Sequence, residues 1–272
     1  MLRLTAAVVV SLAASASIAA AATPPGPQGQ AQGRSEQGRA PKRPGAPPAV
    51  LNVVHHKLKR GTPSNYQTLE ASIVSAYERA KVPRYYWLTF QSTKDPRDVL
   101  YLNLSSTVDE FHSLADAWPA VSSAHPELPR LQQRLAKLIE SQSSTLTTRR
   151  DDIEYGADVD FASMRALLLT TVHVTAGHEG RFVEAVRRAS GSHAPWVVYE
   201  ATEESTFVLV APLKSRAEAK RTSPVPRAVK SLKGVYRDIE TRLYTLAAPM
   251  SRVPEAFLQT RPRSASPRPH AD

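Results

Sequence analysis

The chain of 272 residues contains no cysteine, which excludes disulfides, thiolate metal sites and cysteine nucleophiles. It also has no glycine-rich phosphate loop and no G-x-S-x-G motif, so neither nucleotide cofactors nor α/β-hydrolase chemistry is expected. After the N-terminus, no apolar run approaches the ~20 residues that a membrane-spanning helix needs. The fold must therefore be stabilised by packing, and no standard motif names an activity.

The first 22 residues have the pattern of a secretory signal peptide. Arg3 supplies the positive charge, a short run rich in Ala, Val and Ser follows, and Ala20, Ala21 and Ala22 offer small residues for cleavage. The run is too short and too rich in Ala and Ser for a membrane anchor. We therefore expect an exported protein, periplasmic or extracellular, that is not a transmembrane protein.

Two segments that are poor in large apolar residues flank the central region. Residues 23–49 and 251–272 are rich in Pro, Gly, Gln, Ser and Arg, and such segments bury too little surface to offset their chain entropy. We expect a disordered linker and a disordered basic tail around a folded region at 50–250. Of the net charge of +10, the signal carries +1, the linker +3 and the tail +2, which leaves +4 for the core. So small an excess in an exported protein argues against nucleic-acid binding.

The folded region contains one pattern twice. A strand leads through Gly61 into an amphipathic helix, and a second strand leads through Gly177 into another. Placing one glycine on the other gives an offset of 116 residues, with Tyr66 on Phe182. A capping box that begins at Thr107 in the first copy has a counterpart at Ser215 in the second. The chain is therefore predicted to hold a tandem repeat, with units at 50–155 and 156–250.

Each unit is predicted to contain the element order βαββαβ of a ferredoxin-like fold. In the first unit the strands are expected at 51–58, 85–91, 99–104 and 144–150, with helices after 63, after 107 and at 126–141. In the second unit the strands are expected at 166–174, 196–201, 206–211 and 239–246, with helices at 179–189 and 226–233. One face of such a sheet is bare, and the other unit would cover it. The fold class is thus α+β, with two tandem ferredoxin-like units forming an intrachain pseudo-dimeric barrel.

The strand, the glycine and the helix that bears an aromatic residue (GTPSNYQTL and GHEGRFVEAV), followed by a hairpin, resemble the dimeric α+β barrel superfamily. That group includes NIPSNAP-like and antibiotic biosynthesis monooxygenase-like proteins, and the resemblance covers residues 51–250. It implies a barrel, and it implies either a cofactor-independent or haem-associated oxygenase or a protein without catalysis. A fold of this kind does not by itself identify a function.

Alternation along the first strand of each unit predicts which side chains line the barrel. The predicted ligand-binding residues come from these strands and from the hairpins: His55, Lys57, Tyr86, Thr171, His173 and Tyr199. The neighbours His55 and His56 point to opposite faces of a strand, so no metal site is expected there. His173 or His55 is the best haem ligand under the haem hypothesis, although no cofactor is expected.

Three functions remain open from the sequence. The first is non-catalytic binding of a small apolar or aromatic ligand, or of a partner protein, by an exported protein. The second is a cofactor-independent or haem-associated monooxygenase-like enzyme, and the third is a structural, degenerate member of the group. The chain is expected to be a monomer with an internal pseudo-twofold axis, or a homodimer of it.

Overall fold

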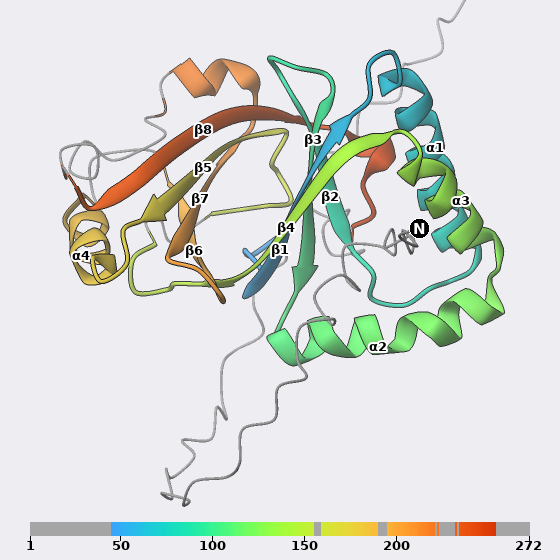
Figure 1. Ribbon diagram of the computed structural model, residues 1–272, viewed down its shortest axis with the longest axis horizontal. Coiled ribbons are helices and arrows are strands. Elements are labelled where there is room, and N and C mark those ends of the chain that lie inside the picture. The colour runs from blue at the N-terminus through green and yellow to red at the C-terminus, as the bar shows by residue number, and fades with distance from the viewer. Residues whose placement is uncertain are drawn as a thin grey trace, which may run out of the picture.

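The computed structural model of the protein describes residues 45–154, 159–189, 195–220, 222, 232 and 234–253 (Figure 1). The predicted signal peptide, most of the linker and tail, and all but one residue of the helix expected at 226–233 lie outside the described residues. The first half contains β1 (Val50–Leu58), α1 (Pro63–Arg79), β2 (Trp87–Ser92), β3 (Asp98–Ser105), α2 (Val108–Ala124), α3 (Glu127–Ala136) and β4 (Ile139–Arg149). The second half contains β5 (Ala166–Val174), α4 (Glu179–Ala189), β6 (Val197–Ala201), β7 (Thr206–Leu213), the 3₁₀ helix η1 (Arg216–Lys220) and β8 (Tyr236–Leu246), followed by a 3₁₀ turn, η2 (Ala248–Met250).

The eight strands form one closed antiparallel barrel in the order β1-β3-β2-β8-β5-β7-β6-β4. The first half contributes the sheet β4-β1-β3-β2 and the second contributes β8-β5-β7-β6, so both sheets have the same strand order. Two short seams close the barrel, each of three residue pairs: β2 pairs with β8, and β4 pairs with β6. The predicted α+β fold with an eight-stranded barrel is confirmed.

The two halves match in detail around their first strands. β5 begins 116 residues after β1, and α4 begins 116 residues after α1. Both strands change register before their last residue, after Lys57 in β1 and after His173 in β5. The turns that follow use Gly61 and Gly177 at φ of 75° and 82°, a conformation that side chains with a Cβ rarely adopt. In these elements, positions 116 residues apart are therefore structurally equivalent.

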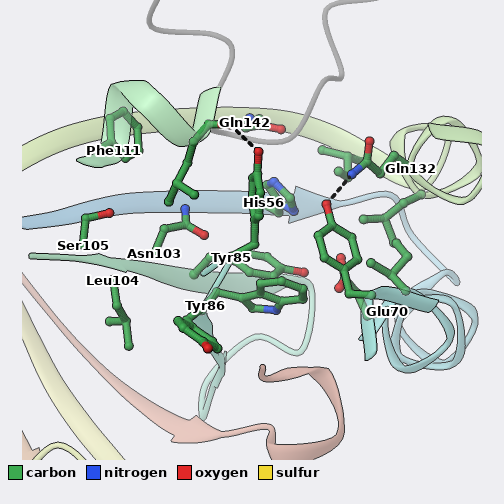
Figure 2. A pocket seen from close by; sticks show the side chains of 17 residues that line it. His56, Glu70, Tyr85, Tyr86, Asn103, Leu104, Ser105, Phe111, Gln132 and Gln142 are labelled. Atoms are coloured by element: carbon green, nitrogen blue, oxygen red, sulfur yellow. Dashed lines mark hydrogen bonds between the residues drawn. The ribbon is translucent and has the colours of Figure 1, made fainter. Parts of the chain in front are cut away.

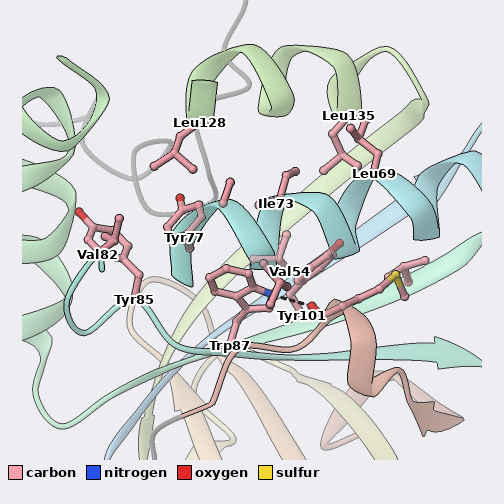
Figure 3. Close-up of a cluster of buried hydrophobic side chains, with 14 of the residues drawn as sticks. Val54, Leu69, Ile73, Tyr77, Val82, Tyr85, Trp87, Tyr101, Leu128 and Leu135 are labelled. Atoms are coloured by element: carbon pink, nitrogen blue, oxygen red, sulfur yellow. Dashed lines mark hydrogen bonds between the residues drawn. The ribbon is translucent and has the colours of Figure 1, made fainter. Parts of the chain in front are cut away.

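Three clusters of buried side chains stabilise the barrel. One lies between the first sheet and helices α1, α2 and α3 (Figure 3). In this cluster Tyr77 stacks on Trp118 with ring centroids 6.0 Å apart. A second lies between the second sheet and α4 and includes Phe182 and Phe207, whose rings are 4.6 Å apart. The third fills the barrel interior with apolar side chains from both sheets, among them Phe90. Each half thus buries the outer face of its sheet under its own helices, and the inner face against the other half.

The closing strands are longer than predicted. β4 begins at Ile139 instead of residue 144, and α3 ends at Ala136 instead of residue 141. β8 likewise begins at Tyr236 rather than at residue 239. Leu58 pairs with Ile139, so β4 pairs with β1 over nearly its whole length. These ladder hydrogen bonds outweigh the helical spacing of the apolar residues around position 138.

Two further expectations can be compared with the structure. The backbone N–H of Glu110 donates to Thr107 Oγ1 at 3.0 Å, so the predicted N-cap of α2 is present. The last residues of the predicted linker, 45–49, pack on the barrel: Arg149 Nη1 donates to the Pro47 carbonyl, and the Tyr199 hydroxyl donates to the Pro48 carbonyl, both at 3.0 Å.

None of the helices in the described part of the chain has the length and apolar character that a membrane crossing requires.

Candidate functional site

A pocket lies in the first half, between the outer face of the sheet and helices α1, α2 and α3 (Figure 2). Its volume is about 80 Å³, which corresponds to ~3 water molecules at ~30 Å³ each. Half-buried Tyr86 and exposed Gln142 border the pocket where it meets solvent. The apolar part of its wall is formed by Ile73, Tyr85, Trp87, Phe111, Leu114 and Leu135.

A row of four polar side chains is buried at one side of this pocket. His56 of β1 lies 2.7 Å, Nδ1 to hydroxyl oxygen, from Tyr66 of α1, and the Tyr66 hydroxyl is hydrogen-bonded to the hydroxyl of Tyr101 on β3. Both hydroxyls hydrogen-bond the carboxyl group of Glu70, one helical turn after Tyr66 on α1. His56, Glu70 and Tyr101 line the pocket, whereas Tyr66 lies behind them.

Burial sets the protonation of this row. It raises the pKa of Glu70 to about 7, although the hydrogen bonds from Tyr101 and Tyr66 act in the opposite direction. Burial also lowers the pKa of His56 to about 4 and raises the pKa values of Tyr66 and Tyr101 well above the ordinary range. At neutral pH the imidazole and both phenols are therefore uncharged, and Glu70 is the group that changes charge.

Two polar atoms that line the pocket are buried without a hydrogen-bond partner at bonding distance among the described residues. They are Nε2 of His56 and Nδ2 of Asn103, although the nearby Gln142 side chain interacts with the His56 ring and acts to raise its pKa against the effect of burial. When the row donates in the direction His56, Tyr66, Tyr101, Glu70, each of these three links has one donor and one acceptor, and His56 carries its proton on Nδ1. The Tyr66 hydroxyl then has no second proton to donate to an ionised Glu70. Nε2 is then an acceptor and Asn103 Nδ2 is a donor, both directed at the same small cavity.

The second half has no such polar groups at the equivalent positions. His56, Tyr66 and Glu70 correspond to residues 116 positions later, and Tyr101 and Asn103 correspond to β7 residues through the matching pairs Val54↔Tyr101 and Thr170↔Leu209. The five equivalents are all buried and apolar: Val172, Phe182, Val186, Leu209 and Ala211. The fold thus accepts apolar residues at every one of these positions, so the polar set in the first half is not required for packing.

A C-terminal strap, residues 247–253, crosses from the second half to the wall of this pocket. Trp87 and Arg252 exchange backbone hydrogen bonds of 2.7 and 2.9 Å, and the Trp87 indole N–H donates to the Met250 carbonyl at 2.7 Å. The Arg252 guanidinium donates to the carbonyls of Val82 and Tyr85. It also lies over the ring of Tyr86, with 5.3 Å between Cζ and the ring centroid. The strap thereby fixes the segment that carries three aromatic pocket residues.

We expect Arg252→Ala to destabilise the protein by roughly 1–3 kcal/mol, because two carbonyl groups lose their donors and an aromatic face loses its cation. Urea denaturation at neutral pH measures the change. The control is Arg188→Ala, which removes an exposed helical ion pair and should change stability by less than about 0.5 kcal/mol. Equal stability of the Arg252→Ala variant and the natural protein would show that the strap contributes nothing to the fold.

The six ligand-binding residues predicted from the sequence do not form one site. Tyr86 lines the pocket described above. Tyr199 packs in the barrel interior. Lys57 forms a 2.6 Å ion pair with Asp95, Thr171 is half-buried on β5, and His173 Nδ1 is hydrogen-bonded to Thr206 Oγ1 at 2.9 Å.

His55 lies in a separate polar cluster where the two halves meet. Its Nδ1 is 3.5 Å from the Tyr244 hydroxyl, which is also 3.5 Å from Asp98 Oδ2, and Asp98 forms a 2.6 Å ion pair with Arg242. Burial lowers the pKa of His55, while the Asp98 charge acts in the opposite direction. The barrel interior is filled by apolar side chains, and neither His55 nor His173 borders the pocket. These two histidines therefore do not fit the predicted role of haem ligand.

Sequence reasoning missed Glu70, Tyr66, Tyr101 and Asn103 as site residues. Tyr66 shares a helix face with apolar residues, Tyr101 lies among apolar strand residues, and Glu70 sits between apolar residues of the same helix as Tyr66. A signal was present in the sequence, because the offset of 116 places His56, Tyr66 and Glu70 on apolar residues. Such one-sided polar substitutions at buried positions indicate a site.

No protein-family profile and no curated protein matches the sequence. Among solved structures, the chain is similar to a candidate monooxygenase from Fusobacterium nucleatum, with a TM-score of 0.51 and 10% identity over 74% of this chain and 93% of that one. It is also similar to an anthrone oxidase-like protein, with a TM-score of 0.48 and 13% identity over 72% and 90% of the two chains. A chlorite dismutase variant from Candidatus Nitrospira defluvii gives a TM-score of 0.46 and 10% identity over 78% and 95%. The likeness to the Fusobacterium nucleatum protein shows a shared fold, in agreement with the barrel expected from the sequence.

Proposed function

We propose that the pocket of the first half binds a single-ring aromatic molecule that carries one hydrogen-bond donor and one acceptor. One observation supports this most: a cavity with a largely apolar and aromatic wall contains an unpartnered acceptor, His56 Nε2, and an unpartnered donor, Asn103 Nδ2. A buried polar atom without a partner costs about 1–3 kcal/mol, so a ligand that satisfies both atoms gains affinity. The aromatic wall favours a flat ring, and the volume limits it to one.

The proposal extends to the organisation of the chain. We propose that the halves arose by duplication, which the common strand order, the offset of 116 residues and the paired register shifts support. Only the first copy then retained or acquired the polar pocket. Export through the N-terminal segment is part of the proposal and rests on the sequence pattern. The same holds for the expected monomer or homodimer with an internal pseudo-twofold axis.

A second candidate function is that of an enzyme of the monooxygenase-like kind. It is favoured by Glu70, a buried carboxyl group with a pKa of about 7 that lines the same cavity as the two unpartnered atoms. A group of this kind can move protons at neutral pH, which pure binding does not require. The third candidate, a structural protein without a ligand, predicts that no ring compound saturates the pocket.

Titration of the full chain with toluene, phenol and 4-cyanophenol, followed by ligand-observed NMR, tests the binding site. We expect affinity to increase in that order, by about tenfold for each hydrogen-bonding group added. His56→Leu should abolish the preference for phenol over toluene, and Asn103→Leu should abolish the preference for 4-cyanophenol over phenol.

The matched control is Tyr199→Phe, which removes a buried hydroxyl outside the pocket and should leave all three affinities unchanged. Equal binding of the three compounds, or the same losses in the control, would contradict the assignment of the two polar atoms. No saturable binding of any compound would leave only the structural function.

A further inference from the structure

The polar row connects the pocket to a buried carboxyl group without a gap. Its first member, His56, presents Nε2 to the cavity and Nδ1 to the Tyr66 hydroxyl at 2.7 Å. The Tyr66 hydroxyl meets that of Tyr101, and both reach Glu70. Each link is a hydrogen bond between groups that can both donate and accept, which is what proton transfer along a row requires.

We propose that Glu70 accepts the acidic proton of the bound ligand through this row, so that the pocket converts a phenol or an enol into its anion. The ligand O–H proton passes to His56 Nε2, the Nδ1 proton passes to Tyr66, the Tyr66 proton passes to Tyr101, and the Tyr101 proton passes to the Glu70 carboxylate. One proton leaves the ligand, one arrives at Glu70, and no other bond is changed. This inference rests on the proposed binding function, because it needs a ligand in the pocket.

The charges around the row favour this exchange over simple ionisation. The negative charge moves from Glu70 to the ligand, so the buried site carries one negative charge before and after the transfer. Among the residues that line the pocket there is no lysine or arginine, and Arg252 lies over the rings of Tyr77 and Tyr86 without lining the cavity, so a second negative charge would have no cation in direct contact. The titratable groups that face Glu70 are Tyr66 and Tyr77 on α1, Tyr101 on β3 and, through Tyr66, His56 on β1.

His56 is suited to pass a proton on rather than to retain one. Burial lowers the pKa of His56 to about 4, so the ring does not hold a second proton at neutral pH. In the row it gains a proton at Nε2 as it loses one at Nδ1, and it stays uncharged. The Asn103 side-chain amide remains available to donate to an acceptor at the other end of the ligand. The ligand class is therefore a weakly acidic phenol or enol with a second, accepting group.

Difference spectroscopy of bound 4-cyanophenol tests the transfer, since the phenol and the phenolate absorb at different wavelengths. At about pH 7.5, above the Glu70 pKa of about 7, we expect the natural protein to bind the phenolate form. Calorimetry in two buffers of different ionisation enthalpy should detect no net proton release, because the proton stays on Glu70. The ¹⁵N shifts of His56 should report a move of its proton from Nδ1 to Nε2.

Two variants interrupt the row at different points. Glu70→Gln keeps the shape but cannot accept the proton, and Tyr66→Phe copies the equivalent Phe182 and breaks the row while both of its ends remain. Both should bind 4-cyanophenol as the phenol, with the phenolate band lost, whereas Tyr199→Phe should keep the band. A phenol spectrum in the natural protein, a phenolate band in Glu70→Gln or Tyr66→Phe, or release of the proton to buffer would overturn the transfer and leave ligand binding intact. Absence of binding would instead overturn the proposed function itself.

Discussion

Replacement of the whole polar row by apolar residues of similar volume is expected to stabilise the protein and to abolish its preference for phenols. The variant combines His56→Leu, Tyr66→Phe, Glu70→Leu and Tyr101→Phe. It removes every partner of every hydrogen bond in the row at once, so no buried donor or acceptor is left behind. Replacement of a buried polar or ionic group with all of its partners is typically neutral or stabilising by about 1–4 kcal/mol.

The second half supports the direction of this effect. At the positions equivalent to His56, Tyr66, Glu70 and Tyr101 it packs four apolar side chains against α4 with no buried carboxyl group: Val172, Phe182, Val186 and Leu209. Urea denaturation near pH 7 measures the gain, and the ring titrations measure the loss of preference. Single substitution Tyr101→Phe is the control and should destabilise by roughly 1–3 kcal/mol, because it leaves Glu70 and Tyr66 short of a partner. A fourfold variant less stable than the natural protein would show that the row serves the fold instead of a ligand.

The second large effect concerns the dependence of stability on pH. Glu70 has a folded pKa of about 7, raised from 4.5, so its contribution to the free energy of unfolding is complete below pH 4.5 and is lost as the pH rises through 7. His56 has a folded pKa of about 4, lowered from 6.5, so its contribution is present above pH 6.5 and is lost as the pH falls through 4. Each shift corresponds to about 3 kcal/mol over its range, with opposite signs.

The two contributions therefore nearly cancel in the natural protein. Each single variant is compared with the double variant that combines His56→Leu and Glu70→Gln. Relative to this double variant, the free energy of unfolding of Glu70→Gln should increase by about 3 kcal/mol as the pH rises from 4 to 6.5. His56→Leu should lose a similar amount as the pH rises from 4.5 to 7. Urea denaturation at a series of pH values gives the free energy of unfolding of each variant as a function of pH. Subtraction of the values for the double variant removes the contribution of all other titrating groups. Parallel profiles of the two single variants would show that neither side chain is titrated as its burial implies.

The barrel could be predicted from the sequence because it depends on local patterns that occur twice. The turn glycines, the apolar helix faces and the Thr107 cap all act over a few residues, and all are present in the structure. The length of β4 could not be predicted, since Ile139 joins the strand through pairing with Leu58, 81 residues earlier. Long-range hydrogen bonding decided that boundary against the local helical periodicity.

The pocket lies on the other face of the sheet from the barrel interior that the predicted strand residues were expected to line. The alternation of residues along β1 predicts a site in the barrel interior, because an uncovered sheet face can line a cavity. In the structure the two halves fill that interior with residues such as Phe90 and Tyr199, and the space lies under the helices instead. Whether two packed faces leave room depends on the side-chain volumes of three helices and four strands together. Tyr101 and Glu70 meet only after β3 and α1 have packed, so no spacing in the sequence reveals their contact.

The C-terminal strap also determines when the pocket can be completed during synthesis of the chain. Trp87 is paired through its indole with Met250, 163 residues further on, and Arg252 follows two residues later. During synthesis the strap emerges after both sheets, so the first half leaves the ribosome long before its aromatic wall can be completed. The pocket therefore becomes competent only after the strap has been made, and a chain that stops before residue 250 carries the polar row with one wall unanchored.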